Sequence, residues 1–278
     1  MVTPSHDDDS RGLPVASVAL IAVDLDGTLL RSDETIDPRT IDAIAQVRRR
    51  GVHVVLATAR PPRGIVPTLR RLELDTLQIT HNGALIYDAS GPRIFHHAPM
   101  NAALARNVVA VTRHVAPSVS VGVEVVDKLH MIGRGPVADA KTAGATPPDE
   151  RRHQVLDQPI TKVLMRGDTG LLGDVRLALK TGLPGRIDFG VSHLRLLQIV
   201  SHGASKADAL VRVARHYHVA RESVMAIGDA PNDLSMMKWA GLSVAGKNAW
   251  RDVRGAAQFV VPSNDDEGVA VAIERFAL

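Results

Sequence analysis

An unbroken apolar run near the N-terminus limits the possible folds more than any other feature. Every position of VALIAV, residues 18–23, is apolar, which is typical of a strand covered on both faces, as in a parallel sheet. A helix is predicted next, because Asp37 can cap its N-terminus and Pro38 suits its first position. VHVVLA, residues 52–57, is mostly apolar and is predicted to be a second strand. Strand, helix and strand make a βαβ unit, so the sequence predicts an α/β sheet with a right-handed crossover.

The pattern changes between about residues 88 and 200. Helical spacing at 101–115 precedes SVSVGVEVV at 118–126, whose period of two is typical of a half-exposed antiparallel strand. One helix with two strands, followed by the same combination again, suggests an α+β insert. After the insert the α/β rhythm returns, with a helix that begins at Ser205 and a strand at 223–229.

We therefore expect the α/β fold class, with a Rossmann-like parallel-sheet core that is interrupted by an α+β domain. Just before the insert, LQITHNGALIY at 77–87 is typical of a strand, a turn at Asn82 and Gly83, and a second strand. The expected divisions are a loose tail at 1–16, a core at 17–87 and 201–278, and the insert at 88–200.

Composition excludes several classes of function. The chain has 278 residues, of which 45% are hydrophobic, enough for one large core or two smaller ones. It has no cysteine, which excludes disulfides, thiolate metal sites and a cysteine nucleophile. The net charge is +3, no basic block is sustained and only 3% of residues are aromatic, so we expect no nucleic-acid partner.

The first residues do not resemble a targeting signal. MVTPSHDDDSRGLP is polar and acidic, the opposite of the basic start of a signal peptide. The apolar run after it stops at Asp24, far short of the roughly 20 residues that span a membrane. We therefore expect a cytoplasmic protein without a membrane partner.

Polar residues follow three of the predicted strands. Asp24 and Asp26 come after the first strand, Thr58 after the second, and Asp229 after a later one. In an open α/β sheet, the loops at the carboxyl ends of strands line the binding crevice, and we expect Lys206, at a helix N-terminus, to join them. Carboxylates without histidine or cysteine suit Mg²⁺, which usually keeps several waters and contacts a substrate phosphate. The hydroxyl and the lysine suit the oxygens of that phosphate.

Four segments follow one another in a characteristic order. They are DLDGTLL from Asp24, ATAR with Thr58, SKADAL with Lys206 and GDAPNDLSMM with Asp229. In this order they resemble the four motifs of the haloacid dehalogenase (HAD) superfamily. The long insert, the HNGALI hairpin before it and the tail SNDDEGVAVAIERF are similar to the Cof-type branch, subfamily IIB. The resemblance covers residues 18–276 and implies the HAD fold with an inserted C2-type α+β cap.

The resemblance implies catalytic roles for two acids. Asp24 would be the nucleophile that forms an aspartyl-phosphate, and Asp26 would protonate the leaving oxygen and then activate the hydrolytic water. An acid at position 26 favours a phosphatase, since the ion-pumping ATPases of the superfamily have threonine there. The implied Mg²⁺ ligands are Asp24, the backbone carbonyl of Asp26, Asp229 and Asp233. The implied phosphate-binding residues are Thr58, Ala59, Lys206 and Asn232.

The chain also departs from the pattern of its relatives. Ala207 stands where many have glycine, and Ala230 where many have glycine or serine. Gln198 stands where many have glutamate, and Lys247 lies in VAGKNA, where relatives often have VAMGNA. None of these removes a catalytic group. Lys247 is expected to alter the rim of the site, so the resemblance does not carry over the substrate.

The candidate residues also have structural alternatives. Asp24 and Asp26 suit a turn at a strand end, since Asp-Gly is common in turns. Taken alone, Thr58 is a strand-end hydroxyl, Lys206 a surface lysine and Asn82 a turn residue. Three residues suit helix capping as well as a site: Asp229, Asn232 and Asp233. Three residues of the insert are either substrate contacts or solvated: His130, Arg134 and His193.

The leading prediction is a Mg²⁺-dependent phosphomonoesterase that acts on a small phosphorylated metabolite, such as a sugar phosphate. A phosphomutase of the same superfamily is an alternative, and a bisphosphate requirement would distinguish it. A signalling receiver domain also phosphorylates an aspartate, but it is far shorter and lacks the insert. A non-catalytic protein that binds a phosphorylated metabolite is the last alternative, and the intact Asp24, Asp26, Lys206 and Asp229 argue against it. The sequence does not indicate the oligomeric state.

Overall fold

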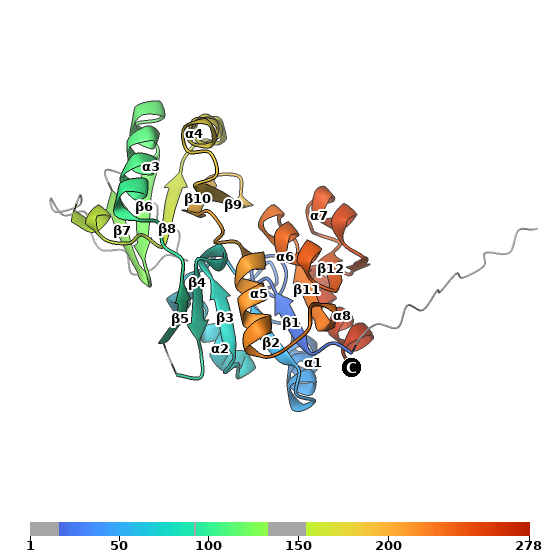
Figure 1. Cartoon of the computed structure of the whole chain (residues 1–278). Coiled ribbons are helices and arrows are strands. Elements are labelled where there is room, and N and C mark those ends of the chain that lie inside the picture. The colour runs from blue at the N-terminus through green and yellow to red at the C-terminus, as the bar shows by residue number, and fades with distance from the viewer. Residues whose placement is uncertain (1–16, 92, 133–153) are drawn as a thin grey trace, which may run out of the picture.

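A five-stranded parallel sheet forms the centre of the core (Figure 1). The computed structural model describes residues 17–91, 93–132 and 154–278, so the expected tail lies outside the described residues. The strand order is β13-β12-β11-β1-β2, and each neighbouring pair is parallel. The strands are β1 (Leu20–Val23), β2 (His53–Leu56), β11 (Val224–Gly228), β12 (Leu242–Gly246) and β13 (Phe259–Val261).

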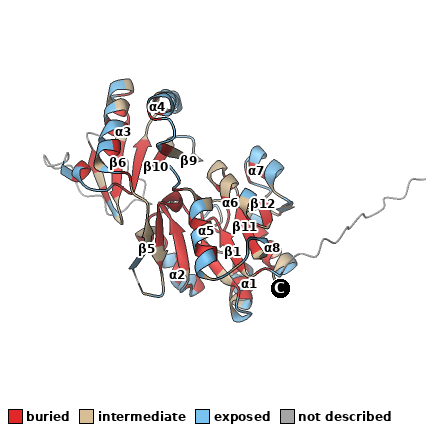
Figure 2. Ribbon diagram, viewed as in Figure 1, coloured by how far each residue is buried: buried red, intermediate tan, exposed pale blue. Residues whose placement is uncertain are grey.

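The central strand β1 is buried on both faces, as its apolar run predicts. Ile21 and Val23 pack in one apolar cluster, and Leu20 and Ala22 pack in another on the opposite face. The first cluster is covered by α1 (Pro38–Arg49), α2 (Val66–Leu72) and α8 (Gly268–Phe276). The second is covered by α5 (Lys206–His216), α6 (Leu234–Trp239) and α7 (Arg251–Ala256). Figure 2 shows the buried strands between helices that expose their outer faces, which confirms the α/β core.

The first crossover helix begins as its sequence predicts. The side chain of Asp37, at the N-cap of α1, accepts a hydrogen bond of 2.8 Å from the backbone N–H of Arg39. Pro38 occupies the first helical position, where its missing N–H has no cost. Two arginines lie in the last turn, where cations interact favourably with the helix dipole.

A small antiparallel sheet extends the core beyond β2. Its order is β3-β4-β5, and a parallel bridge between Ala57 and Ile79 joins β3 to the end of β2. The pairing of β5 with β4 makes this strand part of the small sheet rather than of the cap sheet. The strands are β3 (Leu77–Thr80), β4 (Leu85–Asp88) and β5 (Arg93–His97).

The turn between β3 and β4 is tighter than a simple hairpin loop. His81, Asn82 and Gly83 all have left-handed φ angles, of 52°, 57° and 98°. A Cβ atom at Gly83 would lie 2.1 Å from the carbonyl oxygen of Ser205, so only glycine fits there. The close approach brings Asn82 beside the N-terminus of α5 and the site described below.

The inserted α+β cap contains one antiparallel sheet, in the order β7-β6-β8-β10-β9. Helices α3 (Ala102–Val115) and α4 (Thr169–Gly182) pack on one face through an apolar cluster. Gln198 pairs with Leu164, and Lys162 is two residues from Leu164, so these three side chains share the face opposite to the helices. The strands are β6 (Ser120–Val125), β7 (Lys128–Ile132), β8 (Lys162–Arg166), β9 (Ile187–His193) and β10 (Leu196–Ser201).

Two further points concern the chain as a whole. Among the described helices, none combines the length and the apolar character needed to cross a bilayer. The exact limits of the core and the insert remain predictions.

Several short 3₁₀ turns complete the described structure, among them η1 (Pro62–Gly64) and η6 (Pro231–Asp233), which both lie near the cap.

Candidate active site

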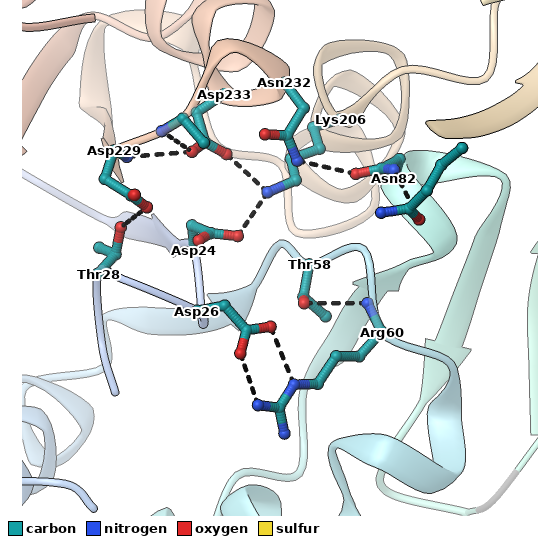
Figure 3. Close-up of polar contacts among 12 residues, drawn as sticks. Asp24, Asp26, Thr28, Thr58, Arg60, Asn82, Lys206, Asp229, Asn232 and Asp233 are labelled. Carbon is teal, nitrogen blue, oxygen red and sulfur yellow. Dashed lines mark hydrogen bonds and ion pairs between the residues drawn. The ribbon is translucent and has the colours of Figure 1, made fainter. Parts of the chain in front are cut away.

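The loops at the carboxyl ends of the parallel strands bring four of the predicted residues together (Figure 3). Asp24 follows β1 directly, Thr58 lies just after β2, and Asp229 follows β11 directly. Lys206 is the first residue of α5, whose N-cap is Ser205. The arrangement is the one expected for an open parallel sheet, where such loops converge.

Lys206 joins two of the acids. Its ammonium nitrogen Nζ lies 2.5 Å from Asp24 Oδ1 and 2.6 Å from Asp233 Oδ1. All three side chains are almost completely buried. Burial by itself would lower the pKa of Lys206, but the charges of Asp233 and Asp24 raise it above its usual value. Lys206 is therefore a buried cation of the site, and the surface alternative is wrong.

Three carboxylates form a cluster that fits a hard cation. Asp24, Asp229 and Asp233 each offer an oxygen, and these oxygens lie within 4.8 Å of one another. Burial and the neighbouring charge of Asp233 raise the pKa of Asp24 well above its usual value. Burial, again with Asp233, raises the pKa of Asp229 to about 6. These buried carboxylates have too little positive charge around them to be ionised together. Carboxylate oxygens of this kind suit a divalent metal such as Mg²⁺.

Asp233 is already held by protein donors at both of its oxygens. Oδ1 contacts Lys206, and Oδ2 accepts hydrogen bonds of 3.0 Å from the backbone N–H groups of Asp229 and Ala230. Asp233 thus does cap the turn at Pro231–Asp233, as one alternative proposed. Its position orients the loop that carries Asp229.

The first motif loop packs tightly against Asp229. Thr28 Oγ1 donates a hydrogen bond of 2.8 Å to Asp229 Oδ1. Gly27 has a φ of 84°, and a Cβ atom there would lie 2.7 Å from Asp229 Oδ2, so a side chain at this position would displace the carboxylate. Thr28 was not among the predicted site residues, although it lies in the DLDGTLL segment.

Asp26 lies across the site from the acid cluster and is paired with Arg60. The guanidinium donates two hydrogen bonds, from Nη2 to Oδ1 at 2.6 Å and from Nε to Oδ2 at 2.9 Å. Arg60 was also missed, although it ends the ATAR segment that contains Thr58. A side chain's direction across a loop cannot be deduced from spacing alone.

Thr58 and Ala59 form the wall opposite the lysine. Thr58 is buried, and its Oγ1 accepts a hydrogen bond of 3.1 Å from the backbone N–H of Arg60. The carbonyl oxygen of Ala59 accepts one of 2.7 Å from Lys162 Nζ of the cap. A cap lysine that was not predicted therefore contacts the segment that carries these two predicted residues.

Asn232 lies on the other side of Lys206. Its Nδ2 donates a hydrogen bond of 2.9 Å to Asn82 Oδ1, while its buried Oδ1 has no partner among the described residues. Asn82 was predicted to lie in a turn. It lies in that turn and also contacts Asn232 beside Lys206 (Figure 3). A cleft of about 400 Å³ opens beside these residues, and its lining includes Asn82, Asp188, His202, Lys206 and Asn232.

Of the three candidate residues of the insert, His130 can be placed, and it does not join this group. His130 pairs with Val123 in the cap sheet, so their side chains lie on the same face. Val123 packs in the apolar cluster under α3 and α4. His130 therefore faces away from the core domain and its site. Arg134 and the side chain of His193 lie outside the described residues.

Comparison with known proteins gives concordant results. The sequence profile of haloacid dehalogenase-like hydrolases matches residues 21–273. The chain is 29% identical to a 5-amino-6-(5-phospho-D-ribitylamino)uracil phosphatase of Bacillus subtilis, covering 92% of this chain and 97% of the relative. It is 27% identical to a putative phosphatase of Haemophilus influenzae, covering 91% and 95%.

Solved structures show the same fold. A haloacid dehalogenase-like hydrolase from Bacteroides thetaiotaomicron superimposes with a TM-score of 0.81 at 29% identity, covering 93% of this chain and 99% of that one. A HAD subclass IIB sugar phosphatase superimposes with a TM-score of 0.78, covering 93% and 99%. The second likeness, at 19% identity, concerns the fold alone.

Proposed function

The chain belongs to the haloacid dehalogenase-like hydrolases, and on this premise we propose its reaction. We propose that it is a Mg²⁺-dependent phosphomonoesterase that acts on a small phosphorylated metabolite through an aspartyl-phosphate. One observation carries the proposal: Lys206 Nζ lies between Asp24 and Asp233, with Asp229 beside them at the strand ends.

Asp24 is the proposed nucleophile. Lys206 holds one of its oxygens, and the other attacks phosphorus while the ester P–O bond breaks. Lys206, the Thr58 hydroxyl and the Asn232 amide are suited to hold the phosphoryl oxygens as their charge spreads, since each can donate a hydrogen bond. The backbone N–H of Ala59 is a further donor in the same wall.

Asp26 is the proposed acid and base. It gives its proton to the leaving oxygen, and the resulting carboxylate then takes a proton from the water that attacks the aspartyl-phosphate. That second step releases inorganic phosphate and restores the carboxylate of Asp24. The water and the leaving group occupy the same place in turn, so one residue serves both steps.

The oxygen donors around Asp24 fit a divalent cation. Asp24, Asp229 and the backbone carbonyl of Asp26 would hold Mg²⁺, with Asp233 orienting the loop. When bound, the cation would offset the repulsion between the carboxylates and the incoming phosphate.

The cleft beside Asn82 is the proposed place of the leaving group. It has polar groups along its rim, among them Asp188, His202 and Asp208, which suit a hydroxylated leaving group such as a sugar or a sugar alcohol. Two of the relatives are named as phosphatases of a ribityl phosphate ester, which supports this class of substrate without fixing its identity.

A screen of phosphorylated metabolites tests the proposal. Purified protein with Mg²⁺ is expected to release inorganic phosphate from one class of ester, and addition of a chelator is expected to stop the release. The absence of release from every ester tested would overturn the proposal. A strict requirement for a bisphosphate, with isomerised product, would instead assign the phosphomutase.

A further inference from the structure

The cap contributes a buried cation to the wall of the site. Lys162, the first residue of β8, is 2% exposed. The other cations near this boundary each pair with a carboxylate: Arg60 with Asp26, Arg63 with Glu124, and Lys206 with Asp24. Within the described part of the chain, Lys162 forms no such ion pair.

Two neutral oxygens hold the ammonium of Lys162 instead. Nζ donates to the carbonyl oxygen of Ala59 at 2.7 Å and to Gln198 Oε1 at 3.0 Å. Ala59 lies in the core, and Gln198 lies on the cap strand β10. Burial without a contacting carboxylate lowers the pKa of Lys162 to about 8. Because a buried charge is costly unless well compensated, a lysine at this place calls for a role that a neutral side chain would not fulfil.

The first contact of Lys162 leads to the threonine proposed to bind phosphate. The carbonyl of Ala59 belongs to the same peptide group as the N–H of Arg60, and this N–H donates to Thr58 Oγ1 at 3.1 Å. A cation on the carbonyl polarises the peptide group and strengthens its N–H as a donor. Since Thr58 Oγ1 accepts that hydrogen bond, its hydroxyl hydrogen is left to point into the site.

The second contact leads to the asparagine on the opposite wall. Gln198 Oε1 also accepts from Asn82 Nδ2, at 3.4 Å, and Asn82 Oδ1 accepts from Asn232 Nδ2 at 2.9 Å. An amide nitrogen has two hydrogens, so Asn232 keeps one for a phosphate oxygen. The cap approaches Asn82 closely at Gly190, where a Cβ atom would lie 2.4 Å from Asn82 Nδ2.

We propose that Lys162 is a positioning residue that joins the two walls of the phosphate site through the cap. One branch runs through the Ala59 carbonyl to Thr58, and the other through Gln198 and Asn82 to Asn232. Both donors are therefore oriented only when the cap lies on the core. This inference rests on the proposed phosphatase function, because it concerns the groups that hold the transferred phosphoryl.

The test compares substitutions on the two branches. Lys162→Met keeps an unbranched side chain that is one atom shorter and removes the charge and the donors, and Gln198→Leu interrupts only the second branch. Lys128→Met is the matched control, because Lys128 is an exposed lysine of the neighbouring strand β7. The measurements are kcat and KM on 4-nitrophenyl phosphate and on glycerol phosphate, and the inhibition constant of inorganic phosphate. Thermal melts confirm that each variant is folded.

Lys162→Met is expected to lower kcat/KM by about 10- to 100-fold on both esters and to weaken inhibition by phosphate, as loss of a supporting partner does. Gln198→Leu should act in the same direction, and the double variant should lose less than the two single losses combined, because the residues share one network. Lys162→Gln, which retains an N–H donor, should recover part of the activity. Lys128→Met should match the wild type.

Three results would overturn the inference. The first is unchanged inhibition by phosphate in Lys162→Met. The second is a loss confined to one of the two esters, which would make Lys162 a leaving-group contact. The third is strict additivity of the two substitutions. If instead the wild type hydrolysed no ester, the proposed function would fail before the role of Lys162 came into question.

Discussion

Arg60 holds both oxygens of Asp26, with Nη2–Oδ1 and Nε–Oδ2 distances of 2.6 Å and 2.9 Å. The planar fork of a guanidinium matches a carboxylate in this geometry, which a lysine cannot reproduce. The pair fixes the position of the Asp26 side chain beside the site, and the partial exposure of 36% leaves room for a substrate to reach it.

Arg60→Lys tests whether the fork aligns the acid. The substitution keeps the positive charge but loses the two parallel hydrogen bonds, so the turnover of an alkyl phosphate should fall about tenfold, equivalent to roughly 1.4 kcal/mol in the barrier. An aryl phosphate, whose leaving group needs no proton, should be affected much less. Arg70→Lys, at an exposed arginine of α2, is the control. Equal losses on both esters would mean that Arg60 acts on the phosphoryl group rather than on Asp26.

Asp26→Ala tests the acid itself. General acid help is typically worth about 10²- to 10⁴-fold, so hydrolysis of alkyl phosphates should fall by this order. Formation of the aspartyl-phosphate from an aryl ester should persist, although the base for its hydrolysis is also lost. Rapid quench with a radiolabelled ester would detect the accumulated phosphoenzyme. An equal loss of the first step with alkyl and aryl esters would contradict the assignment.

The fold and most of the site follow from local patterns in the sequence. The apolar run at Leu20–Val23 predicts a strand covered on both faces, and its burial confirms this. Convergence of Asp24, Thr58 and Asp229 follows because parallel strands end at one edge of the sheet. These predictions need only the order of elements and the residue after each strand.

The contacts that were not predicted depend on distant packing. Lys162 is the first residue of β8 and has no local feature that sets it apart from a surface lysine. It is buried because the cap lies over Ala59, which is 103 positions away in the sequence. Likewise, the Arg60–Asp26 pair depends on how two loops face each other. Sequence spacing places both residues near the site but does not specify that their side chains meet.

Asp24→Asn tests the nucleophile. The amide keeps the shape and one acceptor for Lys206, so the fold should persist, but it does not displace an alkoxide from phosphorus. Turnover should fall by roughly 10⁴-fold or more, as for other catalytic residues that act as a unit. A matched measurement of circular dichroism would show that the fold is kept. A loss of tenfold or less corresponds to only about 1.4 kcal/mol in the activation free energy. Such a small loss would exclude Asp24 as the nucleophile.

The raised pKa of Asp229 predicts how the stability of the metal-free protein depends on pH. Its pKa is raised to about 6 by burial and by Asp233, so between about pH 4 and pH 6 the folded state holds a proton that the unfolded state has lost. Stability of the metal-free protein should therefore fall as the pH rises through this range. Mg²⁺ needs the ionised carboxylate, so its stabilising effect should be larger at pH 7.5 than at pH 5. Melting temperatures with and without Mg²⁺ measure both trends.

Asp229→Asn is the control for that prediction. The amide removes the titrating proton but still offers an oxygen to Thr28. The metal-free variant should melt higher than the wild type at pH 7.5, by about 2–4 °C for each kcal/mol of relieved repulsion, and should gain less from Mg²⁺. If the variant and the wild type showed the same pH slope, the titration of Asp229 would not underlie it.

Lys206→Met tests the cation that lies between two acids. Removal of the ammonium leaves Asp24 and Asp233 buried without their countercharge, which typically costs about 3–5 kcal/mol. The loss should be larger at pH 8 than at pH 5, because burial and the charge of Asp233 raise the pKa of Asp24 and a proton on Asp24 relieves the repulsion. Saturating Mg²⁺ should restore part of the stability, since a cation held by Asp24 and Asp229 supplies positive charge to the same cluster. Lys238→Met, at an exposed lysine of α6, serves as the control in the same urea titrations. A Lys206→Met protein as stable as this control at pH 8 without Mg²⁺ would show that the lysine does not stabilise the acid cluster.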